Sequence, residues 1–269
     1  MALPTNSPTA FCKAFIEREL KSNKQNHIWM SYWPVMERML ERADELTLVF
    51  HELIKKFGYS DKFDGYPPNN AYIWLTLEYI WMSIDFCKND VVQVRLDLKE
   101  LNTLKEEIVE LSEKLAFALR RQDEVYELSG FQKSDYQTTV DMIELASEDN
   151  HLYQSYVSDK IQSLRGQFDL KYWPTRADVA ESIASFEKIQ PSPSHSELPE
   201  SVLKGRASDI KDFVLAFDYS FDGLNGLPSD FRFSNNALAD IINVILDLSS
   251  DRLATGDAIR IVRNRHNRN

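Results

Sequence analysis

The chain has 269 residues, of which 43% are apolar and 27% are charged, and its net charge at pH 7 is −11. These values are ordinary for a globular protein of one large or two small domains, and the acidic charge disfavours binding of the body of the chain to nucleic acid or anionic membranes. Glycine is scarce, at 8 residues, and alternating β-branched patterns are rare, so the sequence predicts an all-α fold.

Hydropathy and cysteine usage predict a cytoplasmic protein with no membrane contact. The first residues show neither the basic nor the apolar region of a signal peptide. The longest apolar run, 71–87, is too short for a membrane span and contains Glu78 and Asp85. The two cysteines, Cys12 and Cys87, belong to no CxxC motif, so we expect free thiols.

Apolar residues recur at helical spacing along most of the chain. The first helix is predicted to begin after Ser7 as N-cap, with Pro8 in its first position, and the second to end at Gly58. In chain order, the predicted helices cover 7–24, 34–57, 71–87, 91–128, 134–168, 175–189, 201–222, 235–248 and the residues from 256 onward. The fifth is expected to break near 147–150. A bundle of long helices with short connections follows from this pattern.

The helix predicted at 91–128 carries a heptad seam. Its seam positions follow at alternating steps of three and four: Leu101, Leu104, Ile108, Leu111, Leu115, Ala118, Gln122 and Val125. Such a seam packs against another helix, and Gln122 would help to set the register if that helix belongs to another chain. Packing within the chain, against 134–168 or 36–57, is favoured because it has no cost of association. We therefore expect 91–128 and 134–168 to form an antiparallel, coiled-coil-like arm.

The sequence also predicts a domain boundary. Residues 190–199 (QPSPSHSELP) contain three prolines and three serines, a composition typical of a linker. On this basis the chain divides into a long-helix bundle over 1–189 and a small helical C-terminal domain over 200–269.

Glu78 and Asp85 are the candidate acidic residues. They lie seven residues apart on one side of the apolar helix at 71–87, and Trp74 and Trp81 flank Glu78. A carboxylate beside indole rings in a dry environment has a raised pKa, as general-acid catalysts do. The alternative is a solvated strip, or pairing with a basic side chain of a neighbouring helix.

The C-terminus is the candidate basic site. Arg260, Arg263, Arg265 and Arg268 lie in the last helix and the tail, where they could bind phosphates or an acidic protein. Cationic side chains also stabilise helix C-termini without binding anything, and nearby aspartates oppose DNA.

Arg260 and His266 have five residues between them, a spacing similar to the R-x4-6-H motif of HEPN-type helical ribonucleases. The resemblance covers seven residues. It implies a metal-independent cleavage of RNA in which His266 acts as a base on the 2′-hydroxyl and Arg260 stabilises the phosphate.

Motifs for cofactors and metals are absent from the sequence. The five histidines form no HxxxH, HExxH or Glu-x-x-His pattern, and no phosphate-binding glycine motif is present, so we expect neither cofactor nor metal. The leading hypothesis is a non-enzymatic interaction protein, an assembly or regulatory subunit that binds another protein or forms a homo-oligomer. The alternatives are a nucleic-acid-binding accessory factor that uses the C-terminal arginines and a HEPN-like ribonuclease.

Overall fold

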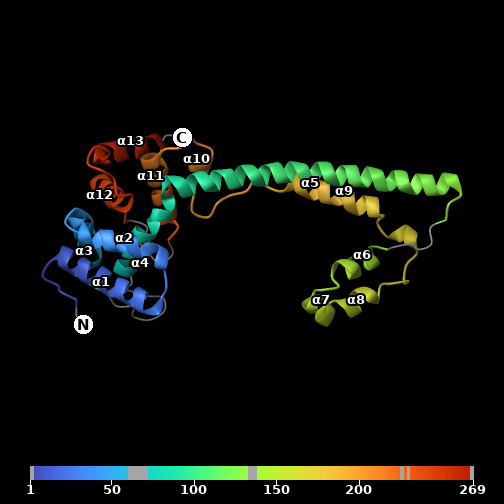
Figure 1. The fold of residues 1–269 in the computed structure, drawn as a ribbon, viewed down its shortest axis with the longest axis horizontal. Coiled ribbons are helices and arrows are strands. Elements are labelled where there is room, and N and C mark those ends of the chain that lie inside the picture. The colour runs from blue at the N-terminus through green and yellow to red at the C-terminus, as the bar shows by residue number, and fades with distance from the viewer. Residues whose placement is uncertain (1–2, 60–71, 133–137, 225–226, 229–230, 267–269) are drawn as a thin grey trace. The chain divides into compact units, whose positions relative to one another are not determined.

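The computed structural model describes residues 3–59, 72–132, 138–224, 227–228 and 231–266, and every regular element in these ranges is a helix (Figure 1). The predicted all-α fold is confirmed. The α-helices are α1 (Pro8–Asn26), α2 (Trp33–Glu41), α3 (Thr47–Phe57), α4 (Tyr72–Met82), α5 (Lys88–Ser129), α6 (Thr139–Ala146), α7 (His151–Tyr156), α8 (Ser158–Gln162), α9 (Arg176–Ile189), α10 (Glu200–Leu203), α11 (Asp209–Asp222), α12 (Asn235–Ile245) and α13 (Gly256–His266). None of the helices in these ranges has the length and apolar content needed to cross a bilayer.

The local signals for helix ends are largely those predicted. Pro8 occupies the first turn of α1, and Gly58 ends α3 with a φ of 72°. Thr175 and Asp178 form a capping box at the start of α9. The helix predicted over 34–57 is divided into α2 and α3, and the region 71–87 ends as a short 3-10 helix, η2 (Ser83–Phe86).

The chain forms two compact units. The first comprises Met1–Leu98 together with Ser194–Asn269, and the second comprises Lys99–Pro193. Helix α5, with 42 residues, is about 63 Å long; it begins in the first unit and continues in the second. The change of unit at Pro193–Ser194 lies inside the predicted linker.

The first unit has one core, to which the N-terminal and the C-terminal helices both contribute. The stacked rings of Phe213, Phe217 and Phe221 form one side of α11. The ring of Tyr79 on α4 packs edge-on against Phe217 at 4.8 Å, and the Tyr79 hydroxyl donates to the Phe217 carbonyl at 2.6 Å. The predicted separation of 1–189 from 200–269 is therefore wrong: the apolar faces of α11 and α12 are buried against α2, α3 and α4.

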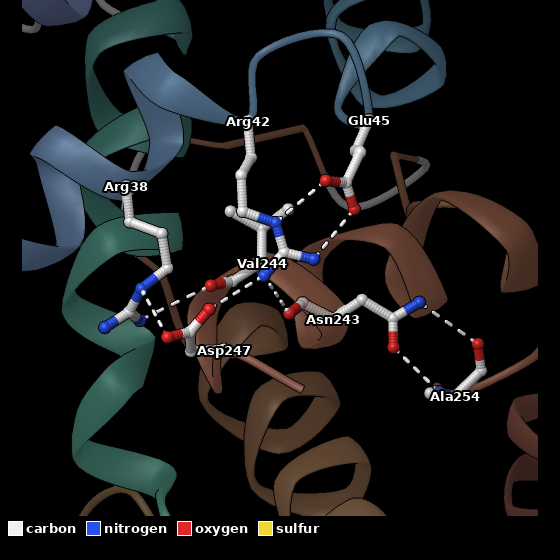
Figure 2. A network of polar contacts seen from close by, with 7 residues as sticks. All are labelled: Arg38, Arg42, Glu45, Asn243, Val244, Asp247 and Ala254. Atoms are coloured by element: carbon white, nitrogen blue, oxygen red, sulfur yellow. Dashed lines mark hydrogen bonds and ion pairs between the residues drawn. The ribbon is translucent and has the colours of Figure 1, made fainter. Parts of the chain in front are cut away.

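A polar cluster joins α2 to the C-terminal end of α12 (Figure 2). Arg38 donates to the Ile245 carbonyl at 2.7 Å, and Arg42 donates to the Asn243 carbonyl at 3.1 Å. Arg42 also donates to both carboxylate oxygens of Glu45 at 2.8 Å and to Asp247 at 3.0 Å. The carbonyls at a helix C-terminus have no partner within the helix and carry a partial negative charge, so two guanidinium groups stabilise this end.

In the second unit, α9 packs antiparallel along α5, as Figure 1 shows. Small side chains line the contact: Ser112 and Ala116 on α5, and Ala177, Ala180 and Ala184 on α9, all of them buried. Polar contacts follow the same antiparallel order, namely Lys105 with the Gln190 carbonyl, Glu113 with Lys188, Arg120 with Glu181, and Gln122 with Arg176.

The expected helix at 134–168 is short and broken. The break near 147–150 is confirmed, since Asn150 accepts from the backbone of Leu152 and Tyr153 and caps α7. Residues 133–137 lie outside the described residues, and a capping box of Thr138 and Asp141 begins α6. The expected arm of 91–128 with 134–168 is not confirmed: the helix that is hydrogen-bonded to α5 is α9. Apart from the hydrogen bond of Arg176 to Gln122 at the end of the seam, α9 contacts a different face from the apolar seam residues.

Candidate functional site

The heptad seam of α5 is exposed along its apolar length. Leu104, Leu111 and Leu115 have relative exposures of 43%, 55% and 52%, and Leu101, Ile108 and Val125 are exposed as well. Because a side chain of this size stabilises a fold by about 1.5–3 kcal/mol only when buried, a row of six exposed ones contributes little to this chain by itself. Within the part of the chain that the structure describes, the seam is a helix face that still requires another helix to bury it.

Helix α9 extends this apolar surface. Ile183 and Phe186 are exposed, Val179 is half-buried, and all three lie away from the alanines that contact α5. An α-helix turns by about 100° per residue. The seam therefore lies about 95° around α5 from the face that contacts α9, and the three apolar residues of α9 lie about 130° around α9 from the face that contacts α5. Since the helices are antiparallel, both rotations bring the apolar side chains to the same side of the pair.

Charged residues border the seam on the side away from α9. Seam residues three apart form successive pairs, and a charged residue directly precedes the first member of each pair. These charged residues are Glu100, Glu107, Lys114 and Arg121. All four are exposed. Lys114 pairs with Glu110 on its own helix, and Arg121 pairs with Glu124. Exposed pairs of this kind contribute little and exchange readily for a better one.

The structure separates the environments of Glu78 and Asp85. Glu78 is half-buried on α4; burial, and to a smaller extent the charge of Glu19, raise its pKa to about 7. Asp85 is exposed in η2 and accepts a hydrogen bond of 2.6 Å from the Tyr32 hydroxyl. A protonated Glu78 can donate a proton. The two carboxyls lie in consecutive elements with different surroundings, since Glu78 is half-buried and Asp85 is exposed.

The C-terminal arginines do not form one basic surface. Arg263 is half-buried and donates to both carboxylate oxygens of Asp218, at 2.7 and 2.8 Å, and to the Phe233 carbonyl at 3.0 Å. It therefore ties α13 to α11 and is not free for phosphate. Arg260 pairs with Asp257 at 3.0 Å, and Arg265 is exposed. Arg268 lies outside the described residues.

Arg260 and His266 are both exposed on α13 but on different sides of it. Six residues correspond to about 120° of rotation and about 9 Å of rise in an α-helix, so the two side chains diverge rather than converge on one phosphate.

Metal-ligating side chains are dispersed in the same way. Among the residues that the structure describes, no three histidine, cysteine, aspartate or glutamate side chains lie together as a metal site. Cys12 is buried, and burial raises the pKa of its thiol to about 12, which keeps it protonated and unreactive at neutral pH.

Sequence reasoning found the seam of α5 but missed the contribution of α9. The signal was available: Ala177, Ala180 and Ala184 recur at helical spacing and predict a close helix contact, while Val179, Ile183 and Phe186 form a second apolar stripe. The most extensive candidate site is therefore the apolar surface of the α5–α9 pair, which we define by the seam from Leu101 to Val125 together with Val179, Ile183 and Phe186. Comparisons with protein-family models, with curated proteins and with solved structures found no match to this chain.

Proposed function

We propose that this chain is a non-enzymatic interaction protein, an assembly or regulatory subunit, and that the α5–α9 surface is its docking site. The supporting observation is the exposed heptad seam on a helix of 42 residues, backed on one side by α9. Two antiparallel helices with one shared apolar side correspond to half of a helical bundle. The chemistry that fits this surface is an amphipathic helix with its own apolar stripe.

The position of the charges agrees with docking of a helix. Charged residues border the apolar strip, whereas the seam itself contains Gln122 as its single polar residue between Leu101 and Val125. Helical interfaces have this order of an apolar centre and a polar rim. Burial of the six apolar seam residues supplies the free energy, and the rim selects the partner and its direction.

The test uses a seam variant and a matched control. Leu104→Asp combined with Leu111→Asp places two charges at the centre of the seam. Phe117→Asp adds a charge at an apolar residue with 73% exposure that lies on the opposite side of α5. Wild-type, seam and control proteins serve as baits in their native host, the captured proteins are quantified by mass spectrometry, and each candidate complex is rebuilt from purified components.

We expect a stoichiometric complex with the wild-type and control proteins, either of the chain with itself or with another protein. The seam variant should lose it by at least a hundredfold in dissociation constant, since two charges forced into an apolar interface cost about 3 kcal/mol or more. Circular dichroism must show equal helix content in all three proteins. Equal assembly of the seam variant and the wild type would refute the proposal.

A further inference from the structure

We infer that the occupant of the seam is a second copy of this chain, with its α5 antiparallel to the first. This inference rests on the proposed docking function of the α5–α9 surface and names its partner. The two-fold axis would pass between Val109 and Glu110. In this register, the residue numbers of two seam residues that face each other across the interface add to 219.

The apolar layers match in this register. Leu101 faces Ala118, Leu104 faces Leu115, and Ile108 faces Leu111 of the second copy, and the two-fold axis repeats each layer. Antiparallel coiled coils pack the first and the fourth heptad positions against each other in this way. Large side chains therefore meet in the centre, and the outer layers combine a leucine with an alanine.

The polar seam residue is also accommodated. Gln122 faces Asp97 of the second copy. Asp97 also lies on α5, and its side chain is exposed. An amide can donate to a carboxylate, so a polar side chain meets another polar side chain instead of a leucine. A mismatch here would leave Gln122 in an apolar layer and destabilise the pair.

The border charges give the strongest argument. Antiparallel helices bring equivalent border positions together, so Glu107 faces Lys114 of the second copy and Glu100 faces Arg121. The two-fold axis doubles this to four attractive pairs. The border is acidic in its N-terminal half and basic in its C-terminal half, which makes it complementary to itself only when the second copy is reversed.

Other arrangements lose this match. A shift of one heptad in either direction places Glu107 opposite Glu107, or Lys114 opposite Lys114, on the two-fold axis. A parallel pair would direct the border toward Lys105, Ser112, Leu119 and Tyr126 of the second copy. These residues lie on the α9 side of α5, where Ser112 is buried. The charges therefore select the antiparallel direction and its register.

Two single charge reversals test the inference, with the full-length protein in each case. In Glu107→Lys, both pairs at the centre become Lys–Lys; in Lys114→Glu, both become Glu–Glu. Two pairs that change from attraction to repulsion should weaken self-association about tenfold or more. When the two variants are mixed, each central pair of a heterodimer again joins a lysine to a glutamate. The mixture should therefore form a heterodimer although each variant alone associates weakly.

The controls reverse charges on the outer side of the same helix. Lys99→Glu and Glu106→Lys lie at the heptad position opposite the seam and are exposed, so self-association should be unchanged. Sedimentation equilibrium over a range of concentrations measures the mass, which should approach twice 31.2 kDa for the wild type. The affinity of the wild type should fall as the salt concentration rises.

The outcomes separate this inference from the docking function. A wild-type protein that is monomeric at every concentration, or two reversals that do not rescue each other, would overturn the second copy as occupant. If the Leu104→Asp, Leu111→Asp variant then still loses a complex with another protein, the docking function stands and the occupant is a different helix. Rescue in the mixture, together with loss in the Leu variant, supports both.

Discussion

At the scale of single residues, Glu78 shows how burial of a charge acts on stability. Its pKa is raised from 4.5 to about 7, first by burial and then by the charge of Glu19. A carboxyl with a raised pKa in the folded state favours folding while it is protonated and loses this contribution as it ionises. The native state therefore loses stability as the pH rises from about 4.5 to above 7.

Glu78→Gln should remove this pH dependence. Above pH 8 we expect the variant to be more stable than the wild type by about 1–2 kcal/mol, after allowance for the partial exposure of the side chain, and near pH 4.5 the difference should vanish. Urea unfolding at pH 4.5, 6, 7 and 8 measures it. Glu17→Gln, at an exposed residue of α1, is the matched control. A difference that stays constant with pH would show that Glu78 does not titrate in this range.

Three arginines of the first unit have defined structural roles. Arg38, Arg42 and Arg263 each donate to backbone carbonyls or to a carboxylate. Their planar groups hold helix ends and neighbouring helices together. Residue type alone therefore identified Arg263 as a possible phosphate ligand, and its contacts identify it as structural.

At the scale of elements, α5 is anchored at its beginning by a buried ion pair. Arg95 donates to Asp212 at 2.8 Å and to the Val202 carbonyl at 2.9 Å, and Asp212 is 2% exposed. The Ser208 amide also donates to Asp212 at 2.8 Å. The pair joins α5 to α10 and α11, so that this end of the long helix is held by charge as well as by apolar contacts.

Arg95→Met should destabilise the first unit by about 3–5 kcal/mol, because the carboxylate of Asp212 stays buried without its hydrogen-bonded cation and keeps only Lys211, at 3.9 Å. The double variant Arg95→Met, Asp212→Leu removes both charges and should cost less than the single one. Urea unfolding followed by near-UV circular dichroism gives both values. A single variant that loses under 1 kcal/mol would mean that water reaches Asp212 and that the pair acts as a surface pair.

The apolar periods of α5 explain why its observed partner differs from the predicted one. Two stripes run along this helix: the leucine seam, and a stripe of smaller or polar residues that includes Val109, Ser112 and Ala116. Hydrophobicity ranks the first stripe higher, but the alanines of α9 fit the second, because small side chains on both helices pack together there. The face used within the chain is therefore the one that combines small buried side chains with polar contacts to α9, and it is not the most hydrophobic one.

At the scale of the whole molecule, the shared core of the first unit makes a strong prediction. A chain that ends at residue 193 lacks α11, α12 and α13, and with them the buried Phe213, Phe217 and Ile242. The faces of α2, α3 and α4 that contact these helices would be exposed. We therefore expect this truncated protein to lose its near-UV circular dichroism signal and its cooperative unfolding transition, while the full-length protein keeps both.

The opposite result would support a domain boundary at 190–199. If residues 1–193 unfold cooperatively, with the near-UV signal of the four tryptophans before residue 90 preserved, the N-terminal helices hold a core of their own and the division at 190–199 is a true domain boundary. A mixture of the truncated chain with a separate 194–269 chain then tests whether the two parts associate.

What the sequence by itself determined is local. Helix content, the start of α1 at Pro8, the end of α3 at Gly58, the linker at 190–199 and the heptad seam all follow from interactions among residues close in the chain. What only the tertiary structure decided is which apolar faces meet. Periodicity marks a face for burial without naming its partner, and that choice depends on the fit of side chains far apart in sequence. The structure buries α12 against α2 and α3, places α9 on the small-residue face of α5, and leaves the leucine seam exposed.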